Sequence, residues 1–195
     1  MKPSASTTHG APLPESQKLA LLKLLSDEDP SVYQAVRARI LSAGDDAWLR
    51  PHCLSPDPLI RRRVQEIVDH LARQGSDDRF LAFCLTQGEE FDIEDAAWLL
   101  ALTRYPEINL AAYRALLDSY AADVLPRIDT SHPSRKSLLV LNRHLFHDLA
   151  FIGNEADYYN PENSYLNRVI DRRTGNPISL CLVYLCLARQ IGRAS

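Results

Sequence analysis

The sequence predicts a mainly α-helical protein. Apolar residues recur at the three- and four-residue spacing of amphipathic helices through most of the chain after residue 15. No segment keeps up the apolar–polar alternation of a half-buried strand. Several helical patterns begin with an Asp-Pro or Asn-type start signal. Residues 1–15 are rich in Ser, Thr, Pro and Gly instead, which is typical of a flexible tail.

Composition and charge exclude several classes of protein. The 195 residues are 46% hydrophobic and carry a net charge of −3, so no strong field favours nucleic acid or an anionic membrane. No apolar run approaches the roughly 20 residues of a membrane span. The four cysteines form no CxxC pair and no regular spacing, which favours reduced thiols in a cytoplasmic protein. We expect no metal and no cofactor.

Two similar segments follow a first helix. Ser16 is the expected cap of that helix, with Leu19, Leu22 and Leu25 on one apolar stripe. Leu-Ser and then Asp-Pro stand ahead of an amphipathic pattern twice, at Asp29-Pro30 and at Asp57-Pro58. Proline fits the first helical position because its missing N–H has no helical partner there. The pair resembles HEAT-type repeats, so residues 16–128 are predicted to be a helical repeat-like region.

Three further helices follow in the predicted order. One runs over 93–104 and stops before Pro106, and the next begins after a capping Asn109. Beyond a loop near 128–134, a helix is expected to point Leu138, Leu141, Leu145 and Leu149 inward. Asp92, Glu94 and Asp95 begin the helix at 93, where acidic side chains suit the helix dipole.

The last helix differs from the others. Almost every residue from 178 to 188 is apolar. A helix that is apolar on all sides is expected to be buried on all sides. We therefore predict that it is central in its domain.

Residues 151–192 carry a recognisable signature. They read F-x-G-N-x-x-x-Y-Y-x-P-x-N-S, then R-R-x-G-x-P-I-S-L, then A-R-x-x-G. The framework positions are Gly153, Asn154, Tyr159, Pro161, Asn163, Ser164, Arg172, Arg173, Gly175 and Pro177. This stretch resembles the transglutaminase-like family of SirB type. The resemblance implies a truncated transglutaminase-like domain over 129–195, the helical half of a papain-like α+β fold, behind HEAT-like helices.

The resemblance also bears on activity. Such folds place a catalytic cysteine at the N-terminus of a buried helix, where the helix dipole stabilises the thiolate. In cysteine-bearing relatives of this motif the nucleophile falls on the position of Pro177. The histidine and the acid of the triad would follow Ser195. We therefore expect a non-catalytic interaction or regulatory protein with a protein partner or a second copy, and expect the uncovered helix face to drive association.

The alternative is a truncated product of an acyl-transfer enzyme with a cysteine or serine nucleophile. Ser179 and Cys181 are the candidate nucleophiles, because both lie near the start of the last helix. For Ser179 the competing role is a helix cap or a core hydrogen bond. For Cys181 it is a buried, inert thiol.

Other polar residues have a structural and a functional interpretation. Arg61, Arg62 and Arg63 are a candidate binding patch for phosphate or an acidic partner, or else a solvated helix face paired with Asp57 or Glu66. His144 and His147 share a helical face, yet no further ligand cluster accompanies them, so partly exposed histidines are expected. Arg172 and Arg173 are expected to tie down the loop that contains Tyr158, Tyr159 and Asn163.

Overall fold

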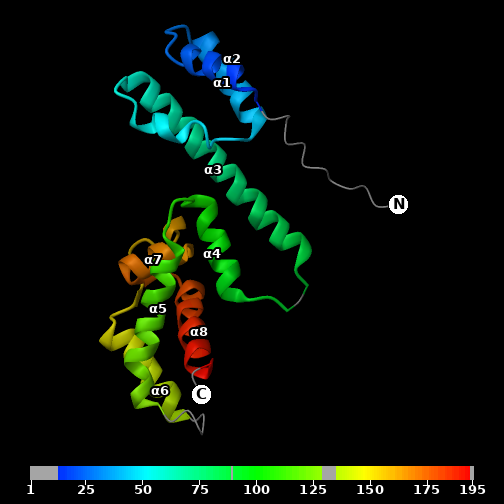
Figure 1. The fold of residues 1–195 in the computed structure, drawn as a ribbon. Helices are drawn as coiled ribbons and strands as arrows, with labels where there is room; N and C mark the ends of the chain where they lie inside the picture. The colour runs from blue at the N-terminus through cyan, green and yellow to red at the C-terminus, as the bar shows by residue number, and fades with distance from the viewer. Residues whose placement is uncertain (1–12, 89, 129–134, 194–195) are drawn as a thin grey trace. The chain divides into compact units, whose positions relative to one another are not determined.

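The computed structural model describes residues 13–88, 90–128 and 135–193 (Figure 1). These residues are mainly α-helical, as the sequence predicts, and their two strands have two residues each. The predicted tail falls mostly outside the described residues. The loop near 128–134 is likewise outside them, apart from Ile128.

The chain divides into two compact units, Met1–Gly75 and Ser76–Ser195. The division falls within the long helix α3 (Pro58–Thr86). The boundary predicted near residue 128 stays a prediction.

The first unit is built from helices around a small core. It contains α1 (Glu15–Leu24), α2 (Pro30–Ala43), the 3₁₀ turn η1 (Arg50–Leu54) and the first part of α3. The buried side chains are those of Leu25, Val36, Ile40, Leu49, Val64, Ile67 and Val68. Both expected Asp-Pro starts are confirmed. Asp29 Oδ1 accepts from the Ser31 amide at 2.8 Å, and Asp57 Oδ1 accepts from the Leu59 amide at 2.8 Å.

The predicted start of α1 was wrong. The helix begins at Glu15 after Pro14, whose carbonyl accepts the first backbone hydrogen bonds, so Ser16 lies inside the first turn. The predicted stripe was wrong at Leu19, which is 69% exposed. The side of α1 that faces the core runs through Leu21 and Leu22 to Leu25, and Leu19 lies outside that arc.

The second unit packs its helices around α8. After α3 its elements are α4 (Ile93–Arg104), α5 (Leu110–Val124), η2 (Leu125–Arg127), α6 (Arg135–Arg143), the π-helical turn η3 (His144–Asp148), β1 (Ile152–Gly153), η4 (Pro161–Ser164), α7 (Leu166–Arg172), β2 (Thr174–Gly175) and α8 (Pro177–Arg193). Helix α8 contacts α4, α5 and α7, and it runs beside α5 in Figure 1. One buried cluster joins these helices, with Trp98, Leu117, Phe151 and Leu187 among its largest members.

The predicted bounds of α4 and the predicted start of α5 are confirmed. Asp92 caps α4, the helix ends before Pro106, and Asn109 Oδ1 accepts from the Ala112 amide at 3.1 Å. Leu141 and Leu145 of the next helical segment are buried as expected. Leu138 was predicted wrongly, since it is 54% exposed. It lies in the first turn of α6, before the residues that reach the core cluster.

Helix α8 is apolar on all sides but not buried on all sides. Leu180, Val183, Cys186, Leu187 and Ile191 face the core. Ile178 is 74% exposed, Leu185 is 43% exposed, and Cys181 lies between them on the exposed face. The prediction of complete burial was therefore wrong, because α4, α5 and α7 cover one side of the helix among the described residues. We call Ile178, Cys181 and Leu185 the α8 stripe.

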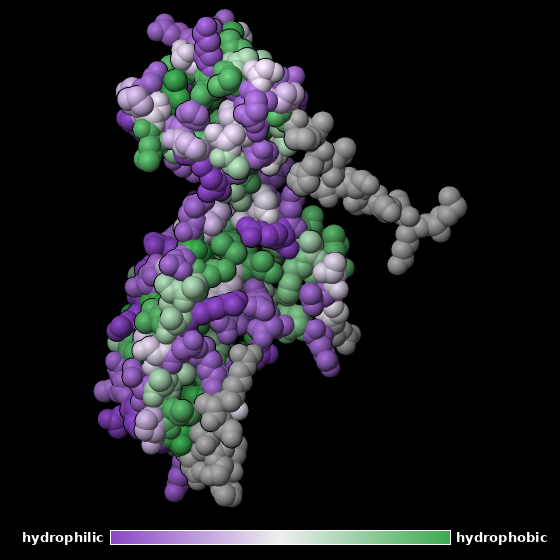
Figure 2. Space-filling view, in the orientation of Figure 1, coloured by the Kyte–Doolittle hydropathy of each residue, from purple (hydrophilic) through white to green (hydrophobic). Residues whose placement is uncertain are grey.

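A second apolar surface lies on the last turns of α3, where Figure 2 shows a hydrophobic face. Leu81 and Leu85 are exposed there, and Phe91 just beyond the helix is exposed as well. This surface is not predicted from the sequence.

Candidate functional site

The signature segment builds the start of α8. Asn176 is the residue before the helix, and its Oδ1 accepts from the Ser179 amide at 2.8 Å. In return Ser179 Oγ donates to the Asn176 carbonyl at 3.0 Å. Pro177 occupies the first helical position. Asn176 is therefore the residue that caps α8, and Ser179 donates a hydrogen bond back to the Asn176 carbonyl.

Gly175 allows this arrangement to close. A Cβ atom at this position would lie 2.5 Å from Ser179 Oγ and 3.0 Å from Val169 Cγ1. The first distance is shorter than a Cβ atom tolerates from any non-bonded atom, and the second is tighter than most Cβ contacts. Only glycine lets β2, α7 and the first turn of α8 approach this closely.

Two short parallel strands hold the segment in place. The Ile152 amide donates to the Arg173 carbonyl at 2.9 Å, and the Asn154 amide donates to the Gly175 carbonyl at 3.0 Å. Arg173 ends α7 with a φ of 50°, in the left-handed region. A non-glycine residue there carries strain, which the surrounding hydrogen bonds offset.

A set of asparagines fixes the loop between the strands. The fully buried Asn163 donates through Nδ2 to the carbonyls of Asp157 and Tyr158, at 2.8 and 3.1 Å. Its Oδ1 accepts from Asn154 Nδ2 at 2.9 Å. Asn176 Nδ2 donates to Ser164 Oγ at 3.3 Å. The three asparagines therefore act through hydrogen bonds that shape the loop and cap α8.

Glu162 connects this loop to α4 and α7. It accepts hydrogen bonds from Tyr105 Oη and, at 2.6 Å, from Arg168 Nε. These two hydrogen bonds, with a smaller contribution from the charge of Arg172, lower the pKa of Glu162. Pro161 begins η4, and Asn160 caps it by accepting from the Glu162 amide at 2.9 Å.

Some framework residues are exposed. Tyr159 is 92% exposed, and its ring meets that of Tyr158 edge-on at a centroid distance of 5.2 Å. Arg173 contributes its backbone carbonyl to the strand pair. The predicted role of the Arg172 and Arg173 side chains as ties to the tyrosine loop stays a prediction.

The two candidate nucleophiles have different surroundings. Ser179 is buried and donates its hydroxyl proton to a backbone carbonyl. Cys181 was expected to be buried, but it is exposed, because its position falls on the uncovered side of α8. Cys186 is the buried cysteine of this helix, and burial raises the pKa of its thiol to about 12.

His144 and His147 differ in their exposure to solvent. His147 is exposed, as expected, whereas His144 is buried, so the expectation of partial exposure was wrong for His144. In the π-helical turn the His144 ring points inward to the Tyr120 carbonyl, which lies 2.9 Å from Nε2. Within the part of the chain that the structure describes, no group of three His, Cys, Asp or Glu side chains is placed to hold a metal ion.

The three arginines of the proposed patch also differ in burial and in their partners. Arg63 is buried, where Nη1 donates to the Leu25 carbonyl at 2.9 Å and the guanidinium lies over the Tyr33 ring. Arg61 donates to the Ser55 carbonyl at 2.8 Å. Arg62 pairs loosely with Glu66 at 3.9 Å. A patch that binds through all three residues stays a prediction.

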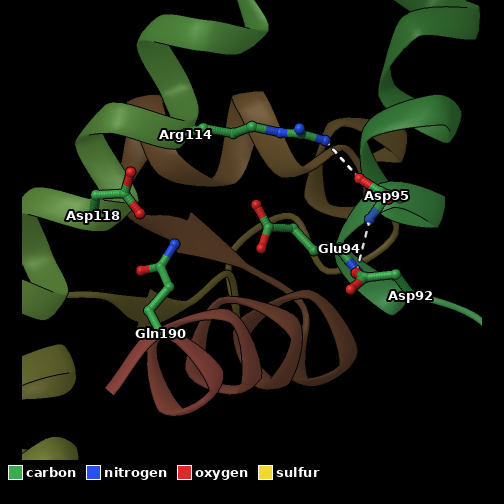
Figure 3. Close-up of a pocket in the computed structure, with 6 residues that line it drawn as sticks. All are labelled: Asp92, Glu94, Asp95, Arg114, Asp118 and Gln190. Carbon is green, nitrogen blue, oxygen red and sulfur yellow. Dashed lines mark hydrogen bonds and ion pairs between the residues drawn. The ribbon is translucent and has the colours of Figure 1, made fainter. Parts of the chain in front are cut away.

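An acidic pocket of about 270 Å³ lies beside α4, α5 and α8 (Figure 3). It is lined by Asp92, Glu94, Asp95, Arg114, Asp118 and Gln190. Asp92 and Asp95 already have partners within the chain, since Asp92 caps α4 and Asp95 pairs with Arg114 at 2.6 Å. Three of these acids, Asp92, Glu94 and Asp95, are predicted from the sequence to lie at a helix start. Asp118 and Gln190 are not predicted there, because only the tertiary fold brings them to the same pocket.

Across the described helices, none combines the length and apolar character needed to cross a bilayer.

Comparisons with known proteins identify the C-terminal part of the chain. Residues 111–194 match the family model described as "Transglutaminase-like superfamily". A UPF0162 protein of Xylella fastidiosa (strain Temecula1 / ATCC 700964) is 36% identical over 104 residues, which are 53% of this chain and 37% of that protein. F-box only protein 21 of Pongo abelii is 38% identical over 106 residues, covering 44% of this chain and 17% of that protein. No solved structure matches. The chain therefore contains a transglutaminase-like region and spans well under half the length of these relatives.

Proposed function

We propose that this chain is a non-catalytic transglutaminase-like protein that acts as a protein-interaction or regulatory module. The observation that carries the proposal is the start of α8. There Pro177 occupies the position of the nucleophile in cysteine-bearing members of the family it resembles. Its ring offers no group that can attack a carbonyl. The neighbouring Ser179 hydroxyl is already committed to the Asn176 carbonyl.

The same proposal assigns the chain to the SirB type of the superfamily. The signature of residues 151–192 supports this assignment. The capped Asp-Pro starts of α2 and α3 support a HEAT-like region in front of it. Cytoplasmic location rests on the cysteine pattern.

The α8 stripe is the proposed contact surface. Its three residues are exposed on a helix whose opposite side is the centre of the core. Exposed apolar area of this kind is typical of protein contacts. A protein partner or a second copy would bury it.

Sedimentation velocity over a range of concentrations tests the contact surface. We expect the chain to associate, and the double variant Ile178→Asp/Leu185→Asp to remain monomeric. Leu138→Asp is the matched control, because Leu138 is similarly exposed but lies on α6. Association that survives in the double variant, or a wild-type chain that stays monomeric at every concentration and in the presence of candidate partners, would contradict the proposal.

An activity assay tests the absence of catalysis. The chain is incubated with a glutamine-containing peptide and a primary amine, and release of ammonia is measured. We expect no release above the buffer rate. Turnover that disappears in Ser179→Ala or Cys181→Ala would overturn the non-catalytic proposal.

The exposed thiol of Cys181 favours one alternative, an acyl-transfer enzyme with a cysteine nucleophile. Its alkylation rate distinguishes the two functions. Cys84 is a matched reference because it is also exposed on a helix. We expect similar rates of reaction with iodoacetamide at both residues. A much faster reaction at Cys181 would indicate an activated thiolate and support the enzyme.

A further inference from the structure

Buried His144 joins three elements of the second unit through both of its ring nitrogens. Nε2 lies 2.9 Å from the Tyr120 carbonyl of α5, and Nδ1 lies 2.7 Å from Arg127 Nη2 of η2. A carbonyl only accepts hydrogen bonds, and a guanidinium only donates them. Nε2 therefore carries the proton, and Nδ1 is a bare acceptor. The contact with Arg127 exists only while the ring is neutral.

Two charged side chains face this ring. Arg127 comes from η2, and Asp148 comes from the same π-helical turn as the histidine. Arg127 Nη1 also donates to Asp148 Oδ2 at 2.9 Å, and the same oxygen lies 3.7 Å from His144 Nδ1. From α5 the contact is the backbone carbonyl of Tyr120. His147 contacts the other oxygen of Asp148, at 3.4 Å, and Arg143 of α6 adds positive charge near that carboxylate.

We propose that Arg127, His144 and Asp148 form an acid-sensitive latch that holds η2 against the π-helical turn. When Nδ1 takes a proton from solvent, two donors face each other across 2.7 Å, and Arg127 must move away. The new Nδ1–H then points toward Asp148 Oδ2, which can accept it after a small movement. Acid therefore exchanges the Arg127–His144 contact for a His144–Asp148 ion pair, which competes with Arg127 for Asp148 Oδ2 and so loosens η2.

The latch is tested between about pH 7.5 and pH 5, an interval in which histidine is the side chain that most often changes charge. The amide of Ile128 is a local reporter, because it donates to the Leu125 carbonyl at 3.1 Å and closes η2. Its hydrogen-exchange protection is measured by NMR on the full chain between pH 7.5 and 5. Rates are divided by the intrinsic rate at each pH.

We expect the protection of Ile128 to fall by about tenfold per pH unit once His144 begins to bind its proton, since one proton is bound per opening. In His144→Gln the fall should vanish, because glutamine retains a donor toward Tyr120 and an acceptor toward Arg127 without titrating. His147→Gln is the matched control and should keep the wild-type response. Constant protection in the wild-type chain would overturn the latch, as would an unchanged fall in His144→Gln.

A second measurement does not depend on the folding of a variant. Nitrogen-15 shifts of the His144 ring in the wild-type chain identify the tautomer directly. We expect the Nε2–H tautomer at pH 7.5 and the doubly protonated ring after η2 opens. A ring that is protonated on Nδ1 at pH 7.5 would overturn the proposal.

Discussion

The starts of α2 and α8 use the same local chemistry in two different settings. In each, an Asp or Asn side chain accepts an amide hydrogen bond and proline takes the first helical position. Around Asp29 the remaining contacts are also local, since its second partner is the hydroxyl of Ser31. Around Asn176 they come from elsewhere in the chain, through Ser164 and the close approach of β2 and α7.

The difference separates a helix start that depends on its own turn from one that depends on the folded unit. A local cap stabilises its helix wherever that helix lies. The start of α8 exists only when the signature loop has folded around it. We therefore expect substitutions there to cost more than matched substitutions in the first unit.

The two tryptophans allow each unit to be followed separately. Trp48 packs against the core of the first unit, and Trp98 is buried in the second. Urea unfolding of Trp48→Phe and Trp98→Phe chains, monitored by fluorescence, reports the free energy of unfolding of one unit at a time. Each variant is compared with the parent chain in these two tryptophan backgrounds.

The largest expected effect is that of Gly175→Ala. The added Cβ would overlap Ser179 Oγ and crowd Val169. We expect the second unit to lose about 3 kcal/mol of unfolding free energy. The control is Gly44→Ala in the first unit, where the left-handed φ of 71° alone predicts a loss of about 1 kcal/mol. Equal losses would contradict the comparison. Gly175→Ala/Ser179→Ala should recover part of the loss.

The next effect tests the hydrogen bonds that the buried Arg63 side chain makes with residues distant in the sequence. Arg63→Met removes the donors to the carbonyls of Leu25 and Asp27. Leaving these carbonyls without a partner is expected to destabilise the first unit by about 2 kcal/mol. Arg62→Met, at an exposed neighbouring position, should change its stability by less than about 0.5 kcal/mol. Similar losses of unfolding free energy in both variants would show that the hydrogen bonds of Arg63 contribute no more than the contacts of a solvated arginine.

Removing the caps compares the two settings directly. Asp29→Ala should destabilise the first unit by about 1 kcal/mol, as for an ordinary cap. Asn176→Ala should cost the second unit about 1.5 kcal/mol, because the hydrogen bond to Ser164 is lost as well. A smaller loss for Asn176→Ala than for Asp29→Ala would refute the distinction.

The smallest effect is expected from acid. The pKa of Glu162 is lowered in the folded chain, so its contribution to stability is complete above its unfolded pKa of about 4.3 and disappears as pH falls through the lower folded pKa. Because the carboxylate is partly solvated, the contribution should stay below about 1 kcal/mol. Glu162→Gln should therefore flatten the dependence of unfolding free energy on pH below about 4.3. Near pH 7 the slope of that dependence should be the same as in the wild-type chain. A variant with the wild-type pH dependence would exclude this role.

Features decided within one turn of helix could be predicted from the sequence. The caps at Asp29, Asp57 and Asn109 and the end of α4 before Pro106 each depend on neighbouring residues only. The signature of residues 151–192 indicated a transglutaminase-like region, and residues 111–194 match the model of that superfamily.

Features decided by packing could not be predicted in the same way. Cys181 and Cys186 lie on one apolar helix, yet one is exposed and the other is buried, because within the described residues α4, α5 and α7 pack against the side that contains Cys186. His144 is buried because the π-helical turn directs its ring toward Tyr120. The acidic pocket unites residues from three helices, and no sequence spacing connects Glu94 with Gln190.

The two-residue strand pair has a consequence for the order of folding. It joins residues whose separation is 22 positions, from Ile152 to Thr174. Closing a flexible loop of that length costs roughly 3 kcal/mol of chain entropy, while two backbone hydrogen bonds return only about 2 kcal/mol. The strands therefore cannot form first. We expect α7 and the asparagine loop to assemble beforehand, so that pulse-labelled amides of Ile152 and Asn154 become protected in the last kinetic phase.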